Sequence, residues 1–137
     1  MYHVLILEPE AAIVELYRRQ ITATGLSDYI AARYAATSEE AARLGAELAT
    51  SAEGLSYLVV DADAFAPPTH AVRKACDLIR PLTSYRSDSQ TKPVVVFVTG
   101  FEGSGREEFE KVGVRGEVEK LSLVGEIRKL LKIPVHT

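Results

Sequence analysis

The amino-acid sequence predicts an α/β fold: a five-stranded parallel sheet with helices on both faces. Two observations support this prediction. Short apolar runs alternate along the chain with stretches whose apolar residues recur at helical spacing. The clearest of these runs contain no polar residue, which is typical of strands buried on both faces, as in parallel sheets. Since right-handed crossovers place helices on both faces of such a sheet, the alternation indicates one α/β layer arrangement.

The expected strands are five apolar runs. The fourth run, Val-Val-Val-Phe-Val, is the clearest, whereas the second and the fifth are weaker signals because they carry fewer β-prone residues. In chain order, the strands are expected at residues 4–7, 30–34, 58–60, 94–98 and 116–118.

Capping and turn residues indicate where the helices begin and end. Pro9 can open the first helix, because its missing N–H would be unsatisfied in a first turn anyway, and Gly25 can end it. Residues 37–40, Thr-Ser-Glu-Glu, form a capping-box pattern for the second helix. Ser122 is the expected N-cap of the last helix, and the polar residues 84–92 are an expected loop.

Composition limits the classes of protein. The 137 residues suit one domain spanning 1–137, with its core over about residues 3–132. At 47% hydrophobic and 26% charged residues, the chain is expected to be globular and cytoplasmic. A net charge of −3 offers no electrostatic case for nucleic acid or an anionic membrane, and the apolar runs are too short to span a bilayer. Cys76 is the single cysteine, so no internal disulfide can form.

Polar side chains stand where four of the expected strands end. Glu8 follows the first strand, Asp61 the third and Thr99 the fourth, and Lys120 lies just past the fifth. In open parallel sheets, ligands bind beyond the carboxyl ends of the strands. Asp61 by itself could be a loop cap, a metal ligand, a nucleophile or an anchor for a sugar nucleotide. The four residues together predict a functional site at this edge.

These motifs resemble the receiver domain of two-component response regulators, over nearly the whole chain from Val4 to about Lys132. The first strand with its acidic end is "LILEPE", and the third with its aspartate is "LVVDADAF". The fourth ends in threonine and a small residue in "VVVFVTG", and "GVRGEVEK" supplies the lysine after the fifth. The resemblance implies a (βα)5, flavodoxin-like fold with strand order 2-1-3-4-5.

The resemblance also implies roles for the site residues. Asp61 would accept a phosphoryl group from a histidine kinase or phosphotransfer protein, and Thr99, Gly100 and Lys120 would contact that group. Such a domain passes on a signal and is not an enzyme in the ordinary sense. The cofactor would be Mg²⁺, because phosphoryl transfer requires charge neutralisation. Its implied ligands are Glu8, Asp61 and the backbone carbonyl of Asp63, with Glu10 as a further candidate.

Receivers commonly bind partners through the fourth helix, the fifth strand and the last helix. On this chain, that surface would include Phe109, Val112, Val114 and Glu117. The implied partners are an effector domain or a second copy of the chain.

The chain departs from the family pattern at three places. Pro9 stands where the family has the acidic residue that usually binds the metal directly, and a proline side chain has no oxygen to offer. Glu117, expected to be a solvated edge residue, stands three residues before Lys120, where the family usually has a switch aromatic. Residues 64–67, Ala-Phe-Ala-Pro, replace a loop that usually carries Met-Pro and a glycine.

Three functions therefore stay open. The first is a phosphorylatable receiver, and the second is a pseudo-receiver that binds proteins without using phosphate, as Pro9 and Glu117 favour. The third is an enzyme or nucleotide binder that uses Asp61 and Asp63 as a metal–nucleotide anchor. This D-x-D pattern is common by chance, and 137 residues leave little chain for a substrate domain.

Overall fold

One five-stranded parallel sheet organises the chain, of which the computed structural model describes residues 1–84 and 93–132. The strand order is β2-β1-β3-β4-β5, and every neighbouring pair is parallel. The predicted fold class and strand order are confirmed. The strands are β1 (Tyr2–Leu7), β2 (Ile30–Ala35), β3 (Tyr57–Asp61), β4 (Val95–Thr99) and β5 (Val114–Glu117).

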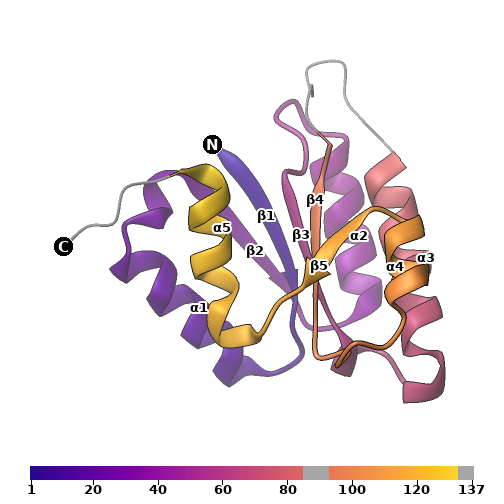
Figure 1. The fold of residues 1–137 in the computed structure, drawn as a ribbon. Helices are drawn as coiled ribbons and strands as arrows, with labels where there is room; N and C mark the ends of the chain where they lie inside the picture. The colour runs from indigo at the N-terminus through magenta and orange to yellow at the C-terminus, as the bar shows by residue number, and fades with distance from the viewer. Residues whose placement is uncertain (85–92, 133–137) are drawn as a thin grey trace.

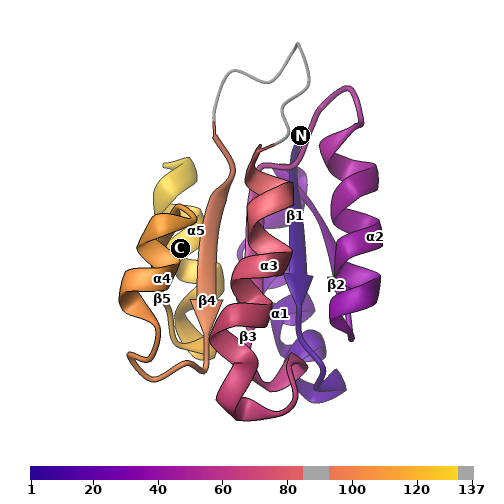
Figure 2. The same ribbon diagram turned by 90° about the vertical axis from the view of Figure 1, so that its right-hand side faces the viewer.

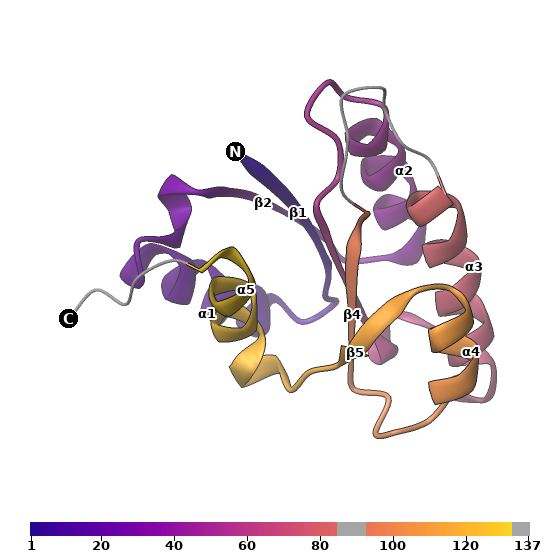
Figure 3. The ribbon, with the colours of Figure 1, turned by 45° about the horizontal axis from the view of Figure 1, so that its top comes forward.

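Helices cover both faces of the sheet (Figure 1). Helices α1 and α5 pack on one face, and α2, α3 and α4 pack on the other, as the tilted view in Figure 3 shows. Figure 2 shows α3 in front of the central strands, with α2 and α4 on either side. The helices are α1 (Ala11–Ala23), α2 (Ser38–Ala49), α3 (Ala71–Ser84), α4 (Arg106–Lys111) and α5 (Leu123–Leu131).

The sheet separates two hydrophobic cores. Successive side chains of a strand point to opposite faces, so β1 supplies Leu5 and Leu7 to one core and Val4 and Ile6 to the other. All four side chains are buried, as expected for a central parallel strand. No helix within the described residues is long and apolar enough to cross a membrane.

The helix signals were right at two ends, displaced at one and wrong at one. Pro9 lies before the first turn of α1, because Glu10 is the N-cap residue. Gly25 follows α1 with φ of 74°, and the Thr37 hydroxyl accepts a hydrogen bond from the Glu40 N–H at 3.2 Å. Ser122, however, makes no capping hydrogen bond. It lies in a 3₁₀ turn (Lys120–Ser122) that runs directly into α5, so its backbone (φ −99°, ψ −9°) lacks the extended conformation of an N-cap. Of the expected loop, Ser84 belongs to α3 and residues 85–92 lie outside the described residues.

Candidate functional site

Three buried polar side chains meet at the carboxyl edge of the sheet. Asp61 pairs in register with Thr99, because β3 and β4 are neighbours and end together. Glu8 follows directly after Leu7, which pairs with Val60, so Glu8 and Asp61 end adjacent strands. Glu8, Asp61 and Thr99 are 2%, 0% and 1% exposed, and they are the buried polar or charged residues of the described chain.

The Asp61 carboxylate has a partner on each oxygen. The Thr99 hydroxyl donates a hydrogen bond to Oδ1 at 3.0 Å. The Lys120 ammonium lies 3.3 Å from Oδ2. The structure thus brings together three of the residues that the sequence singled out.

Lys120 also binds Glu8. Its Nζ lies 2.9 Å from Glu8 Oε1, so one ammonium bridges the carboxylates at the ends of β1 and β3. The other oxygen, Glu8 Oε2, accepts a hydrogen bond from the Glu10 backbone N–H at 3.0 Å. Within the described chain, Glu8 Oε1 and Asp61 Oδ2 have no donor other than this ammonium.

The pKa values of Asp61 and Lys120 are both raised above their ordinary values. Burial raises the pKa of the Asp61 carboxyl above its ordinary value and the Glu8 charge raises it further, while Lys120 and Thr99 partly offset both. Burial alone would lower the pKa of the Lys120 ammonium, but the hydrogen bond to Glu8 and the charge of Asp61 outweigh it and raise that pKa. The carboxylates therefore hold the lysine charged.

Gly100 allows the chain to turn close to Asp61. Its φ is +77°, a conformation that residues with a Cβ adopt only with strain. A Cβ at this position would also lie 3.0 Å from Asp61 Oδ1. The small residue after Thr99 is thus required by the backbone and by the space around the carboxylate.

The side chains of Glu10 and Asp63 lie outside this cluster, and the Asp63 carbonyl stays a predicted ligand. Glu10 and Asp63 are exposed, Glu10 as the N-cap residue of α1 and Asp63 in a 3₁₀ turn (Ala62–Ala64) after β3. Pro9 is exposed as well. No group of three or more acidic, histidine or cysteine side chains that could hold a metal occurs in residues 1–84 and 93–132. Two carboxylates that already share an ammonium do not, as they lie, fit a divalent cation, which favours several anionic oxygens.

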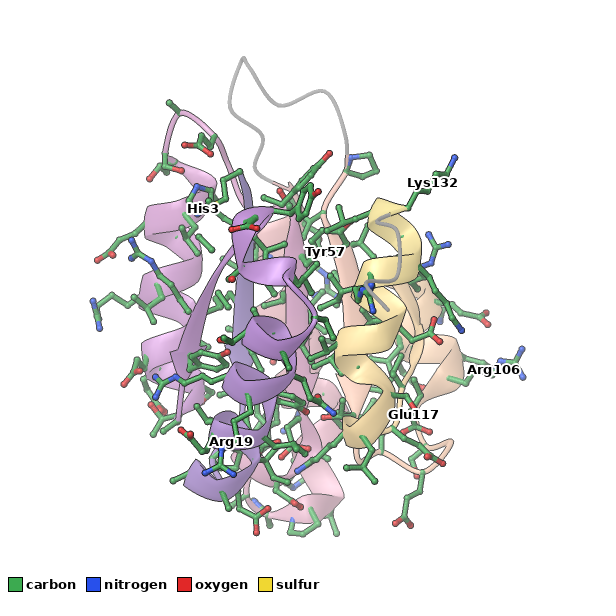
Figure 4. The ribbon with its side chains drawn as sticks, turned by 90° about the vertical axis from the view of Figure 1, so that its left-hand side faces the viewer. His3, Arg19, Tyr57, Arg106, Glu117 and Lys132 are labelled. Carbon is green, nitrogen blue, oxygen red and sulfur yellow. The ribbon has the colours of Figure 1, made fainter. Side chains whose placement is uncertain are left out.

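Glu117 is exposed, as expected, but it also has a specific contact that was not predicted. Its Oε1 accepts a hydrogen bond from the Gly103 backbone N–H at 2.9 Å, and so ties β5 to the loop between β4 and α4. Figure 4 shows Glu117 toward the end of the molecule where the strands finish, and His3 toward the end where they begin. Fourteen residues separate the two partners, and no local pattern in the sequence signals such a pair.

Tyr17, in α1, is a second residue whose surroundings the sequence did not predict. It is fully buried, and its hydroxyl has no hydrogen-bond partner in the part of the chain that the structure describes. Burial raises the pKa of this phenol, and the charges of Glu8 and Asp61 raise it further. The electrostatic effect of the site therefore extends to the core beneath α1.

The expected partner surface lies partly inside the domain. Phe109 and Val112 are buried in the core on the α3 and α4 side of the sheet. The Phe109 ring packs edge-on against Phe101 there, with 4.8 Å between ring centroids. Val114 is half-buried and Glu117 is exposed. A cavity of about 330 Å³ lies beside them, with Phe109, Val114 and Glu117 in its lining. Of the four residues, Glu117 and Val114 are the ones that a partner could reach.

No protein-family model matches the chain, and no curated protein does. Solved structures do match it. A two-component response regulator from Legionella pneumophila is 19% identical, with a TM-score of 0.62 and 96% of each chain covered. A response regulator receiver protein from Pseudomonas putida is 20% identical, with a TM-score of 0.61, over 96% of this chain and 95% of that one.

A response regulator receiver protein from Burkholderia phymatum is similar over the full length of both chains, with 16% identity and a TM-score of 0.61. Identities at this level support a common architecture and not a common activity. The five strands in the order β2-β1-β3-β4-β5 agree with that architecture. The chain therefore has the fold of response-regulator receiver domains.

Proposed function

We propose that this chain is a receiver domain of a two-component system, in which Asp61 accepts a phosphoryl group. The observation that carries the proposal is the contact of one carboxylate with both Thr99 and Lys120, at the edge where the strands end. A nucleophile, a hydroxyl donor and an ammonium are groups that serve phosphoryl transfer to a carboxylate. The donor would be a histidine kinase or a phosphotransfer protein.

The chemistry follows from these groups. A carboxylate oxygen of Asp61 would attack the phosphorus of a phosphohistidine; the new oxygen–phosphorus bond forms as the phosphorus–nitrogen bond breaks, and the imidazole leaves with that electron pair. The Thr99 hydroxyl would donate a hydrogen bond to one phosphoryl oxygen, and the Lys120 ammonium would neutralise another as a point charge. The product adds roughly −1.5 to −2 charges beside Glu8, by analogy with other phosphorylated side chains.

A phosphate-independent pseudo-receiver is the second candidate, and a specific observation favours it. Asp61 is 0% exposed, so its carboxylate cannot meet a phosphodonor unless the loops above it move. Pro9 adds to this, because it supplies no side-chain oxygen for the cation that usually assists the transfer. On this alternative, the same fold serves as a protein-binding module.

The nucleotide-binding alternative loses its support. It required Asp61 and Asp63 to act as a pair, yet Asp61 is fully buried and held by Lys120, whereas Asp63 is exposed in the following turn. A signalling module accounts for these positions better than a nucleotide-dependent enzyme. An effector domain or a second copy of the chain would be the downstream partner, and a cytoplasmic location belongs to the same proposal.

The test uses beryllofluoride, a mimic of the phosphoryl group, with the wild-type chain and the Asp61→Asn variant. Backbone NMR spectra are recorded with and without Mg²⁺, and the intact mass is measured after incubation with acetyl phosphate. Shifts at Thr99, Gly100 and Lys120 that need Asp61, together with the mass of one added phosphoryl group, would support the phosphoacceptor. No response to either reagent with Mg²⁺ present would reject it in favour of the pseudo-receiver.

A further inference from the structure

All four carboxylate oxygens of the site are already bound by groups of this chain. Lys120 takes one oxygen of Glu8 and one of Asp61, at 2.9 and 3.3 Å. The remaining two accept hydrogen bonds from the Glu10 backbone N–H and the Thr99 hydroxyl, both at 3.0 Å. Each of the four oxygens thus faces a partner in the described chain, and Lys120 is the cation among these partners.

The ammonium is well placed to stabilise two neighbouring negative charges. Adjacent strands lie about 4.8 Å apart, so carboxylates at the ends of β1 and β3 repel each other strongly when they are buried. Lys120 reaches them from the turn after β5, on the far side of β4. Its side chain is 22% exposed, which leaves it more accessible than either acid.

Few further side-chain ligands for a competing cation lie around Glu8 and Asp61. Mg²⁺ requires an octahedral set of oxygen ligands and gives up its water reluctantly, so its affinity follows the number of anionic ligands. Pro9 has no side-chain oxygen, and the side chains of Glu10 and Asp63 are exposed. Of anionic side chains in the described cluster, an entering ion would gain only two carboxylates, and it would have to displace Lys120 from both.

We propose that the Lys120 ammonium is the resident cation of this site: it occupies the place between Glu8 and Asp61 that a divalent metal would otherwise take, and excludes the metal from it. The geometry that supports this is the shared ammonium together with the full set of partners on the four oxygens. The inference does not depend on whether Asp61 accepts a phosphoryl group.

The test is a titration with Mg²⁺ alone, followed through backbone NMR signals and thermal unfolding, with Mn²⁺ as a paramagnetic probe of the same position. It compares the wild-type chain with Lys120→Met and, as a matched control, Lys129→Met. Lys129 lies in a surface pair with Glu126, where its side chain is 77% exposed. Lys120→Met frees two anionic ligands, so its affinity for Mg²⁺ should rise roughly tenfold or more over the wild type.

The Mg²⁺ titrations of the three chains distinguish the proposal from its alternative. The proposal predicts no saturable response of the wild type or of Lys129→Met at millimolar Mg²⁺. It also predicts that Lys120→Met gains a response at Ala62 and Thr99, which a further Asp61→Asn change removes. Equal Mg²⁺ affinity in the wild type and Lys120→Met would overturn it.

A measurement on the wild type alone covers the case in which Lys120→Met does not fold. The side-chain ammonium signal of Lys120 should be visible by NMR, because two ion pairs hold it, and it should not change as Mg²⁺ is added. A saturable shift of that signal, together with the Ala62 amide, would refute the inference. None of these measurements involves a phosphoryl donor. The proposal about Lys120 can therefore be wrong while Asp61 accepts a phosphoryl group, and it can be right while Asp61 does not.

Discussion

Replacing Lys120 with methionine should destabilise the folded chain at neutral pH, because Glu8 and Asp61 share its ammonium. Removing one partner of a fully buried ion pair costs about 3–5 kcal/mol. The Lys120 side chain is partly exposed, so water can reach the gap that it leaves, and we expect a loss of about 2–4 kcal/mol in the free energy of unfolding. Methionine keeps most of the apolar stem, which limits the contribution from lost packing.

The stability lost in Lys120→Met should depend on pH, in a direction that follows from the pKa of Asp61. The pKa of Asp61 is already raised in the folded chain, and loss of the ammonium raises it further. A carboxyl with a raised pKa binds more protons in the folded than in the unfolded state, so stability is greatest in acid and falls as the pH rises through the folded pKa. The deficit of Lys120→Met should therefore be smallest in acid and largest near neutrality.

The assay is urea unfolding of the wild type, Lys120→Met and the surface control Lys129→Met, followed by circular dichroism at several pH values. The control should lie within about 0.5 kcal/mol of the wild type. Adding Asp61→Asn to Lys120→Met should recover part of the loss, because one buried charge is then absent. The reasoning is refuted if Lys120→Met unfolds at the same urea concentration as Lys129→Met at neutral pH.

Three further predictions concern residues around the site. Gly100→Ala should lower stability by about 1–3 kcal/mol, more than Gly103→Ala in the same thermal-unfolding assay, because both glycines have positive φ but only Gly100 approaches Asp61. Glu117→Ala should speed hydrogen exchange at the Gly103 amide, whereas Glu117→Gln, which keeps an oxygen acceptor, should preserve protection. Asp61→Asn should gain stability relative to the wild type as the pH rises toward neutrality, since it cannot ionise; equal pH profiles for the two chains in urea unfolding would contradict the raised pKa.

The strands could be predicted because their signal is local. A run such as residues 94–98 must be buried whichever elements surround it, and β4 follows with a shift of one residue, at Val95–Thr99. The position of the fifth strand was harder to predict from the sequence. It begins at Val114, two residues before the expected start, because its apolar content is low and its pairing with β4, including an irregularity at Val96 and Phe97, decides where it lies.

The site could be predicted only as a set of positions. Parallel strands bring their carboxyl ends to one edge, and that rule was enough to place Glu8, Asp61 and Thr99 together. The contacts among them depend on distances across several strands, which no spacing in the sequence encodes. For the same reason, the sequence did not predict the hydrogen bond from Gly103 to Glu117 or the burial of Tyr17 near the acidic pair.

Pro9 and Lys120 act on the same quantity, the affinity of the acidic pair for a divalent cation. Pro9 offers no side-chain oxygen, and Lys120 contacts both carboxylates. Pro9→Asp leaves the pair bound to the ammonium, and because Pro9 is exposed just before α1, an added carboxylate there is compatible with the helix N-terminus.

Mg²⁺ affinity, measured by the NMR titration described above, should therefore be lowest in the wild type, higher in Pro9→Asp and in Lys120→Met, and highest when the two changes are combined. If Pro9→Asp alone bound Mg²⁺ as tightly as the combined variant, the ammonium would not be competing with the metal. The missing acid would then account for the whole difference from a metal-binding receiver.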